Sequence, residues 1–433
     1  MRRFQTWAGT HTSRPRTWCS PASETEVEAH LAWAMRHGRR VRPVGSGHSW
    51  SDVAVPDDVA LDLTRMRQVL DLDVGARRIR VQAGIRLEEL SEALDHAGLA
   101  MPILGSIGKQ SLAGAISTGT HGSSLRHGNL AALIDSLRLA TPRGDVLALD
   151  ASHAWLPAAR VGLGALGVVT EATVRVVPAF QLQESVTFVP ITEVEASLES
   201  LATGDEFVKV WWFPTAPEAM VFRLTRTARA PVERPLARWF DEQITNRIVF
   251  EGVLRLAGRV PSMTAWINRA IVRSYFGASS PPARSFRAFH LAMPPLHRET
   301  ELAVPIGRAA ALLADVRAAI ATHGWRINFP VEIRFVAQDD AWMSPAHGHP
   351  TCQIGFYQAQ SADLAPYFAA VAAIGREHGG RPHWGKEFDL DASALRTLYP
   401  RFDDFVALRR ELDPSGTLRS PALDRIFGID AAG

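Results

Sequence analysis

The sequence predicts an α+β protein with two units, and three observations support this prediction. Its 433 residues exceed the length at which a single hydrophobic core stops growing, so two domains are expected. Helix and strand patterns alternate up to about residue 178, which predicts a first α/β unit. Beyond that point several strand patterns are accompanied by long helical ones, which predicts a mixed or antiparallel sheet backed by helices.

The elements of the first unit follow from local patterns. Ser23 and Glu26 form a capping box, and apolar residues keep helical spacing until Gly38, which predicts a helix between them. A second helix is expected from Leu87 to Leu94, with Gly98 as its C-cap. Alternating apolar residues predict strands at residues 40–44, 59–63, 77–83, 136–140, 146–149 and 172–176.

The second unit is predicted in the same way. Strands are expected at residues 208–213, 220–224, 296–304, 330–337 and 352–358, and helices at residues 307–323, 364–378 and 395–412. The stretch from Pro231 to about Pro295 is arginine-rich and helical in pattern, and Ser279-Ser280-Pro281-Pro282 interrupts it. We interpret this stretch as an insertion or lid.

Composition excludes several classes of protein. The formal net charge of +2 gives no bulk attraction to nucleic acid, so no nucleic-acid partner is expected. Cys19 and Cys352 are too few for a disulfide framework. His347 and His349 lack a third ligand at a sensible spacing, so no metal site is expected. Without an apolar N-terminal run or a stretch of membrane-spanning length, we expect a cytoplasmic protein with no stable membrane insertion.

The chain is organised around a short glycine turn, Gly45-Ser46-Gly47-His48-Ser49. Glycines on both sides of a serine allow positive φ and close approach to a ligand, and His48 follows directly. An isolated histidine would more often be structural, but this position favours an imidazole that meets the ligand. Small residues and hydroxyls recur at residues 105–108 and 111–122. Two such walls predict one large, planar, anionic cofactor between them.

Residues Gly162 to Gly167 match G-x-G-x-x-G literally, the pattern of a dinucleotide-binding turn. That turn needs a helix after it, whereas residues 168–177 alternate as a strand. We therefore favour a tight glycine turn beside the cofactor over a nicotinamide-binding site.

Three charged residues are candidates for chemistry. Glu332 and Arg334 are two positions apart on a predicted strand, so their side chains share one face. A surface ion pair is the plain alternative; in the functional interpretation Glu332 orients the guanidinium of Arg334. Lys386 follows a proline, an aromatic residue and a glycine in the segment Arg381–Lys386, where a solvated lysine in an ordinary loop is the alternative.

Together these motifs resemble the vanillyl-alcohol-oxidase superfamily of flavoproteins. The chain carries Val44–Asp52, Thr118–Gly122, Pro330–Arg334 with Asp339–Trp342, and His383–Lys386 followed by Tyr399–Phe402, in the order found in sugar-lactone oxidases. The branch that it resembles contains gulonolactone oxidase, arabinonolactone oxidase and alditol oxidase. The resemblance spans almost the whole chain and is weakest between Arg226 and Pro295.

The resemblance implies a specific domain organisation. Residues 1–178 would form a PCMH-type FAD-binding domain of two subdomains. Residues 179–390 would form the substrate-binding cap, with an insertion at about 226–295, and residues 391–433 would pack back on the FAD domain. It also implies FAD bound covalently through His48.

The resemblance also assigns roles to individual residues. Glu332, Arg334 and Lys386 would form the catalytic site over the flavin, and His383 would lie near the isoalloxazine. With the glycine turn, the other expected cofactor-binding residues give the full set Gly45, Ser46, Gly47, His48, Ser49, Ser106, Ser111, Gly119, Thr120, His121, Gly122, Val168 and His383.

The implied reaction is oxidation of the CH–OH group of an aldono-1,4-lactone or related sugar alcohol by FAD. Oxygen or another electron acceptor would reoxidise the flavin. Two departures stand out: Gly355-Phe356-Tyr357 lies where alditol oxidase supplies a histidine, and Leu418-Arg419-Ser420-Pro421 lies where relatives usually have an asparagine before the proline. Alternatives are a flavin oxidase of a larger alcohol and a nicotinamide-dependent dehydrogenase using the Gly162 turn.

Overall fold

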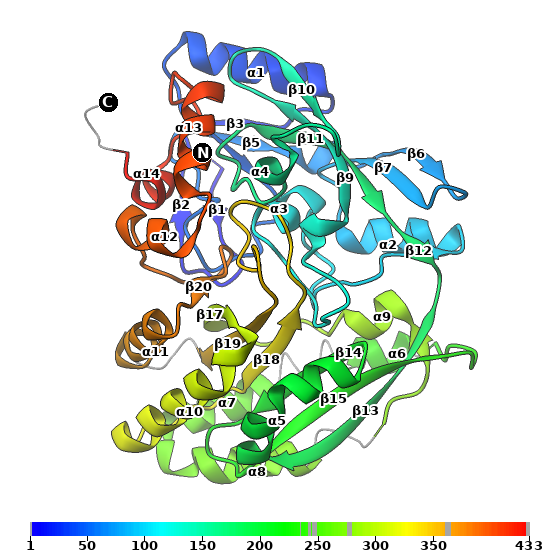
Figure 1. Cartoon of the computed structure of the whole chain (residues 1–433), viewed down its shortest axis with the longest axis vertical. Helices are drawn as coiled ribbons and strands as arrows, with labels where there is room; N and C mark the ends of the chain where they lie inside the picture. The colour runs from blue at the N-terminus through cyan, green and yellow to red at the C-terminus, as the bar shows by residue number, and fades with distance from the viewer. Residues whose placement is uncertain are drawn as a thin grey trace.

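The computed structural model describes residues 2–233, 235–240, 244, 249–274, 279–359 and 365–429, and it confirms the α+β class. Figure 1 shows two halves. One, here called the N-terminal half, combines the first 178 residues with the C-terminal helices. The other is built on one large sheet, here called the cap sheet.

The first subdomain of the N-terminal half is a small parallel sheet in the order β3-β5-β4. Its strands are β3 (Thr17–Cys19), β5 (Val59–Asp62) and β4 (Val41–Val44). Helix α1 (Glu24–Arg36) packs Val27 and Leu31 against it. The predicted cap is confirmed, because the Ser23 hydroxyl accepts a hydrogen bond from the Glu26 N–H at 3.2 Å.

The second subdomain is an antiparallel sheet in the order β10-β9-β11-β7-β6. The expectation of an α/β unit is therefore wrong for this part, because its neighbouring strands run antiparallel and need no helical crossover between them. The strands are β6 (Val69–Asp73), β7 (Arg78–Gln82), β9 (Ile134–Ala140), β10 (Val146–Leu149) and β11 (Val168–Arg175), and the helices are α2 (Leu87–His96), α3 (Leu112–Ser117) and α4 (Leu156–Arg160). Short elements complete the half: β1 (Phe4–Gln5), β2 (Thr12–Ser13), η1 (Leu63–Arg65), β8 (Leu99–Ala100), η2 (Leu130–Leu133) and β12 (Val177–Pro178).

The cap sheet is antiparallel throughout and has the order β16-β13-β15-β14-β18-β19-β17-β20. Its strands are β13 (Gln181–Pro190), β14 (Phe207–Trp212), β15 (Glu218–Thr227), β16 (Ala283–Arg284), β17 (His297–Pro305), β18 (Val331–Val336), β19 (Thr351–Ala359) and β20 (Arg381–Pro382).

Helices cover one face of the cap sheet: α5 (Ile191–Gly204), α10 (Ile306–His323) and α11 (Ala365–Glu377). Alternate strand residues such as Val210, Ile333 and Ile354 pack against them in one apolar cluster. Because side chains alternate along a strand, the intervening residues lie on the opposite face, which is turned towards the N-terminal half.

The arginine-rich stretch contributes helices α6 (Pro235–Phe240), α7 (Glu251–Arg259), η4 (Pro261–Met263), α8 (Thr264–Ser274) and α9 (Ser285–Phe289). Helix α8 buries Val272 against Phe213 and Phe222 of the cap. Parts of the predicted insertion, and Leu364 of the predicted helix 364–378, lie outside the described residues.

The prediction of one helix over residues 395–412 is wrong. The chain forms α12 (Ala392–Leu398) and α13 (Phe402–Leu412), since Pro400 between them cannot donate the backbone hydrogen bond that a continuous helix needs. A further helix, α14 (Pro421–Phe427), follows. Residues of all three helices belong to the same apolar core as the antiparallel sheet of the N-terminal half.

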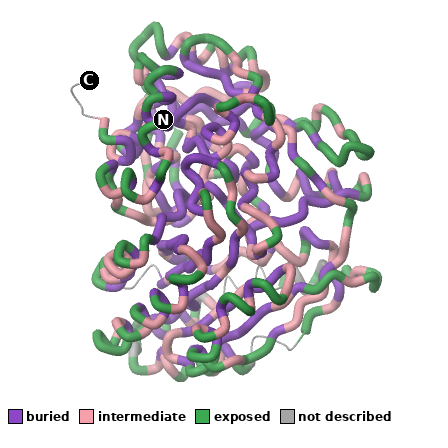
Figure 2. The backbone as a smooth tube through the Cα atoms, in the orientation of Figure 1, coloured by how far each residue is buried: buried purple, intermediate pink, exposed green. Residues whose placement is uncertain are grey.

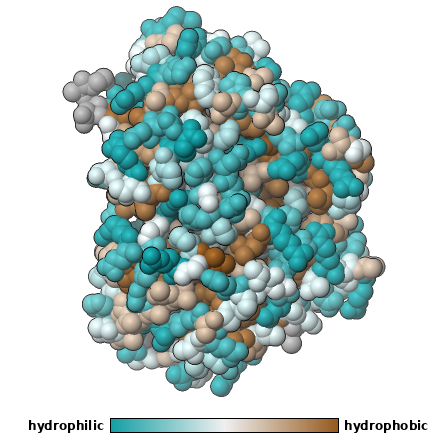
Figure 3. All heavy atoms as spheres, viewed as in Figure 1, coloured by the Kyte–Doolittle hydropathy of each residue, from teal (hydrophilic) through white to brown (hydrophobic). Residues whose placement is uncertain are grey.

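Burial follows these layers. In Figure 2 the buried segments run through the sheets, while exposed residues occur on outer helices and turns. The face in Figure 3 is largely hydrophilic, with hydrophobic residues in scattered patches. Among the described helices, none has the length and apolar composition that crossing a bilayer requires.

The departure at Ser420 has a structural explanation that can be tested. Its hydroxyl caps α14 by accepting a hydrogen bond from the Leu423 N–H at 3.3 Å, and Pro421 occupies the first helical turn. We expect Ser420→Ala to lower the free energy of unfolding by about 1 kcal/mol. Ser420→Asn should retain most of the stability, because asparagine caps equally well. Urea unfolding of wild type and both variants measures this, and equal midpoints for wild type and Ser420→Ala would contradict the capping role.

Candidate active site

A cavity lies within the N-terminal half. The glycine turn contributes Gly45 to its wall, the start of α3 contributes Ser111 and Gly114, and the turn at Gly162–Gly167 closes another side. Gly45 of the His48 turn and residues at the start of α3 therefore border one cavity, whereas His48 itself and residues 105–108 of the second predicted wall do not line it.

Glycine is required at the closest points of this wall. A Cβ on Gly45 would overlap the Ser111 hydroxyl, and one on Gly167 would come within 2.8 Å of the Ala140 carbonyl oxygen. Gly47 has a φ of +64°, a conformation that L side chains rarely adopt. The chain is thus built to bring backbone groups close to whatever the cavity holds.

The Gly162–Gly167 turn lacks the context of a dinucleotide-binding motif. In this described stretch α4 precedes the turn and strand β11 follows it directly, so the turn does not lead into a helix N-terminus that could hold a pyrophosphate. Instead the buried guanidinium of Arg42 donates hydrogen bonds to the carbonyl oxygens of Leu163 and Gly164, the latter at 3.1 Å. These contacts fix the turn as one wall of the cavity.

His48 packs against aromatic rings, and one of its ring nitrogens makes no hydrogen bond to the described residues. Its ring lies 5.0 Å from Trp7 and 6.1 Å from Trp50, and its buried Nε2 has no hydrogen-bond partner within the described part of the chain. Burial, followed by the charge of Lys386, lowers the pKa of His48 to about 3. The imidazole is therefore neutral at physiological pH, as a nucleophilic ring nitrogen must be.

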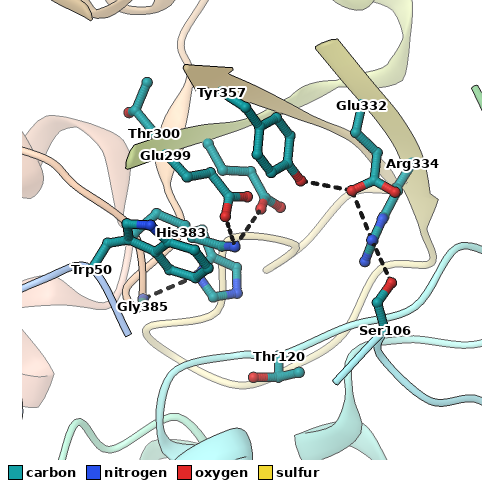
Figure 4. Close-up of polar contacts among 12 residues, drawn as sticks. Trp50, Ser106, Thr120, Glu299, Thr300, Glu332, Arg334, Tyr357, His383 and Gly385 are labelled. Carbon is teal, nitrogen blue, oxygen red and sulfur yellow. Dashed lines mark hydrogen bonds and ion pairs between the residues drawn. The ribbon is translucent and has the colours of Figure 1, made fainter. Parts of the chain in front are cut away.

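The inner face of the cap sheet carries the predicted acid and guanidinium (Figure 4). Glu332 and Arg334 project from β18 on the same side, and Arg334 Nη2 donates to Glu332 Oε2 at 2.7 Å. The same nitrogen donates to the Ser106 hydroxyl of the N-terminal half at 2.8 Å. Both side chains are largely buried, so this is not a solvated surface ion pair.

Glu332 accepts hydrogen bonds from three donors. Besides Arg334, Trp211 Nε1 donates to Oε1 and the Tyr357 hydroxyl donates to Oε2, each at 2.7 Å. Burial alone would raise the pKa of this carboxyl, but Arg334 and then Lys209 outweigh burial and hold the pKa at about 2. The carboxylate is thus permanently charged and fixes the position of Arg334.

Lys386 reaches the same face from the loop after β20. Its ammonium forms an ion pair with Glu299, lies 4.0 Å from Glu301, and sits 4.0 Å above the Trp50 ring. The loop is tied to the glycine turn, because the backbone N–H of Trp50 donates to the Gly385 carbonyl at 2.8 Å. Lys386 is thereby brought near the His48 turn.

The remaining histidines form a second buried group. His121 Nε2 bonds Glu301 at 2.6 Å, and its ring lies 5.5 Å from that of His383. Nδ1 of His383 accepts the Gly385 N–H at 3.0 Å. Burial is the largest influence on His383 and lowers its pKa to about 3, although the charge of Glu301 opposes this shift.

The other predicted cofactor-binding residues lie in several different places. Ser106 and Gly122 border a separate pocket that Arg334 also lines, while Thr120 accepts a hydrogen bond from Gln110. Val168 does not line the cavity: its side chain lies in the core with α1, and the next residue, Val169, lines the cavity because side chains alternate along β11. Ser46 is exposed, and Gly119 adopts positive φ and packs beside Pro345.

Sequence reasoning missed part of the site. Glu299 and Glu301 on β17 and Trp211 on β14 were not proposed, although all three touch predicted site residues. The signal was present as His297-x-Glu299-x-Glu301, polar residues at every second position of a predicted strand, which places them on one face. Tyr357 was noted as a departure, and its contact with Glu332 gives it a role.

Five buried polar atoms of this site have no hydrogen-bond partner among the described residues. They are His48 Nε2, Ser49 Oγ, His297 Nε2, Glu299 Oε1 and Arg334 Nε. Because buried polar groups are normally hydrogen-bonded, such a concentration is typical of a site that binds polar ligands. With the glycine-walled cavity, the residues fit a large flavin nucleotide and a polar substrate beside it.

Known proteins resemble this chain along its whole length. A family described as D-arabinono-1,4-lactone oxidase matches residues 172–426, and one described as FAD binding domain matches residues 15–150. L-gulono-1,4-lactone dehydrogenase of Mycobacterium tuberculosis is 33% identical over 429 residues, covering 98% of this chain and 99% of that protein. L-gulonolactone oxidase of Scyliorhinus torazame is 32% identical over 432 residues, covering 98% of each.

Solved structures show the same fold. A solvent-stable cholesterol oxidase has a TM-score of 0.84 and covers 98% of this chain and 97% of its own. Its sequence identity is 18%, so the likeness concerns the fold alone.

The buried histidines predict how stability depends on pH. His383 has a folded pKa of about 3 against an ordinary value of 6.5, so below pH 6.5 the unfolded chain binds a proton that the folded chain does not. Stability present above pH 6.5 is therefore lost as the pH falls. Between pH 6.5 and 4.5 we expect the free energy of unfolding of wild-type protein to fall by about 2 kcal/mol more than that of the His383→Asn variant. Urea unfolding at pH 7.5 and 4.5 measures it; parallel losses in both proteins would contradict the assignment.

Proposed function

The chain belongs to the D-arabinono-1,4-lactone oxidase family, and from this we propose that it oxidises the CH–OH group of an aldono-1,4-lactone with FAD. The enzyme class, an FAD-dependent oxidoreductase acting on CH–OH donors, agrees with both matching families. The observation that carries the proposal is that the Glu332–Arg334 pair shares the inner face of the cap sheet with Glu301, which lies opposite Gly355 as Glu332 does and 4.0 Å from Lys386. The His48 turn is joined to the Lys386 loop by the hydrogen bond from the Trp50 N–H to the Gly385 carbonyl.

FAD supplies the hydride acceptor for this reaction. The residues proposed to hold it line the glycine-walled cavity: Gly45, Ser111 and the Gly162–Gly167 turn. His48 presents its Nε2, and we propose that this nitrogen carries the covalent bond to the flavin ring methyl. The absence of a partner for Nε2 among the described residues and the low pKa of the imidazole support that bond.

Oxidation of a carbinol releases a proton from its O–H and leaves charge to be stabilised. Arg334 can do this because Glu332 and Ser106 fix its guanidinium at the junction of the two halves. An ammonium beside the carbinol can act in two ways, by assisting O–H deprotonation or by stabilising the substrate oxygen, and Lys386 is the candidate for both. Its ion pair with Glu299 favours the second role, since a carboxylate partner stabilises the cation.

Two finer points stay proposals. Relatives include both a dehydrogenase and an oxidase, so we propose either oxygen or another acceptor as the group that reoxidises the flavin. The resemblance places the segment Gly355-Phe356-Tyr357 where alditol oxidase supplies a histidine, and Tyr357 of this segment donates a hydrogen bond to Glu332, which we take to favour a lactone over a polyol. Anaerobic reduction of the flavin by a panel of lactones and alditols, followed by admission of air, distinguishes these cases.

The covalent bond is tested by denaturation. If His48 is linked to the flavin, acid-precipitated wild-type protein should retain the yellow colour, while His48→Ala should release all of it into the supernatant. Flavin absorbance in pellet and supernatant measures this. Wild-type flavin that washes free would remove the linkage and leave the fold intact.

The role of Lys386 is tested by flavin reduction. Lys386→Met keeps the length of the side chain but removes its charge, so we expect the rate of anaerobic flavin reduction by an aldono-1,4-lactone to fall by a factor of about 10² or more. Stopped-flow absorbance gives the rate, and flavin content confirms that cofactor is still bound. An unchanged rate would exclude Lys386 from the chemistry.

A further inference from the structure

Lys209 is a third cation on the inner face of the cap sheet. It lies on β14, one position beyond the pair Val210–Ile333, so the register places it beside Arg334 of β18. Like charges directly opposite one another across two strands are destabilising. Only three of the 47 basic residues in the chain are lysines, and another is Lys386. Lysine is therefore rare in this chain, and two of its three lysines lie on the inner face of the cap sheet or against it.

The ammonium of Lys209 contacts aromatic rings instead of a carboxylate. Its Nζ lies 5.1 Å from the centre of the Trp211 ring and 5.0 Å from that of Phe222. Among the described residues no carboxylate forms an ion pair with it. Glu332 acts on it electrostatically but already accepts three hydrogen bonds, and Glu184 acts on it only through its charge. Burial lowers the pKa of Lys209, as expected for a cation short of negative charge.

The pocket beside Arg334 shows where a counter-charge could bind. Lys209, Arg334 and Ser106 belong to its polar lining, and Phe207 and Phe289 belong to its apolar walls. The pocket therefore adjoins the proposed catalytic guanidinium, and the described residues that line it include two cations and no carboxylate. A buried cation that is not compensated is costly, so the pocket favours an anionic occupant.

We propose that this pocket, here called the Lys209 pocket, binds an anionic group of the substrate, a carboxylate or a phosphate, remote from the carbinol that is oxidised. The inference rests on the proposed function and narrows its substrate class to acidic lactones. A purely structural lysine held by aromatic rings is the alternative. Ring contacts satisfy the charge in part, but they provide no acceptors for the three N–H donors of an ammonium.

Three matched substrates test the proposal on the full-length flavoprotein. They are an aldono-1,4-lactone with its terminal CH₂OH, the same lactone with a terminal carboxylate, and its terminal phosphate ester. We expect wild-type kcat/KM, measured by anaerobic flavin reduction, to favour at least one anionic lactone by about tenfold or more. Comparison of the carboxylate with the phosphate identifies which anion is preferred.

Variants separate recognition from folding. Lys209→Met should lower the ratio of anionic to neutral kcat/KM by about tenfold or more, and Lys209→Arg should retain part of it. Arg269→Met removes an exposed cation from α8 and should leave the ratio unchanged. Wild-type protein that prefers the neutral lactone, or Lys209→Met protein that loses activity equally with all three, would overturn the proposal.

Failure of the proposed function gives a different result. If no lactone reduces the flavin, the lactone activity is wrong, and binding is then scored by titrating flavin absorbance with each lactone. Tighter binding of an anionic lactone by wild type than by Lys209→Met protein would still support the Lys209 pocket. Equal dissociation constants would overturn it.

Discussion

The structure depends on one buried carboxylate, that of Glu332. A charge removed from water is tolerated only when partners replace its hydration, and Glu332 has Arg334, Trp211 and Tyr357 around it. These donors come from three neighbouring strands, so the carboxylate fixes their side chains relative to one another. Because Arg334 also bonds Ser106, the same charge positions the cap against the N-terminal half.

The site is assembled from segments that are far apart in the chain. Ser51 donates to the Trp384 carbonyl at 2.7 Å, and the Glu387 N–H donates to the Glu299 carbonyl at 3.0 Å. These contacts join the glycine turn, the loop after β20 and strand β17. A hydrogen bond is directional, so each fixes orientation as well as proximity. These contacts of the neighbouring segments place Lys386 above the Trp50 ring.

Local patterns predicted elements well where one face is buried and the other is polar. The capping box of Ser23 and the alternation around Glu332 are such cases, because burial on one side imposes a period on the sequence. Strand β13 and helix α5 were not predicted. β13 carries polar residues on both faces, so polar and apolar residues alternate only weakly along it. The prediction of one helix across Pro400 was wrong because apolar residues keep helical spacing on both sides of the proline, although the helix ends before it and a new one begins after it.

The sequence by itself determined which residues could do chemistry: the glycines beside His48, the acid and guanidinium two positions apart, and the glycine-containing loop of Lys386. Strand periodicity and backbone sterics act over a few residues, so the chain displays them directly. Only the tertiary structure decided that Glu299 pairs with Lys386, and that Lys209 lies beside Arg334 with no carboxylate partner among the described residues. Electrostatic energies depend on distance and burial, which arise when strands remote in sequence are paired.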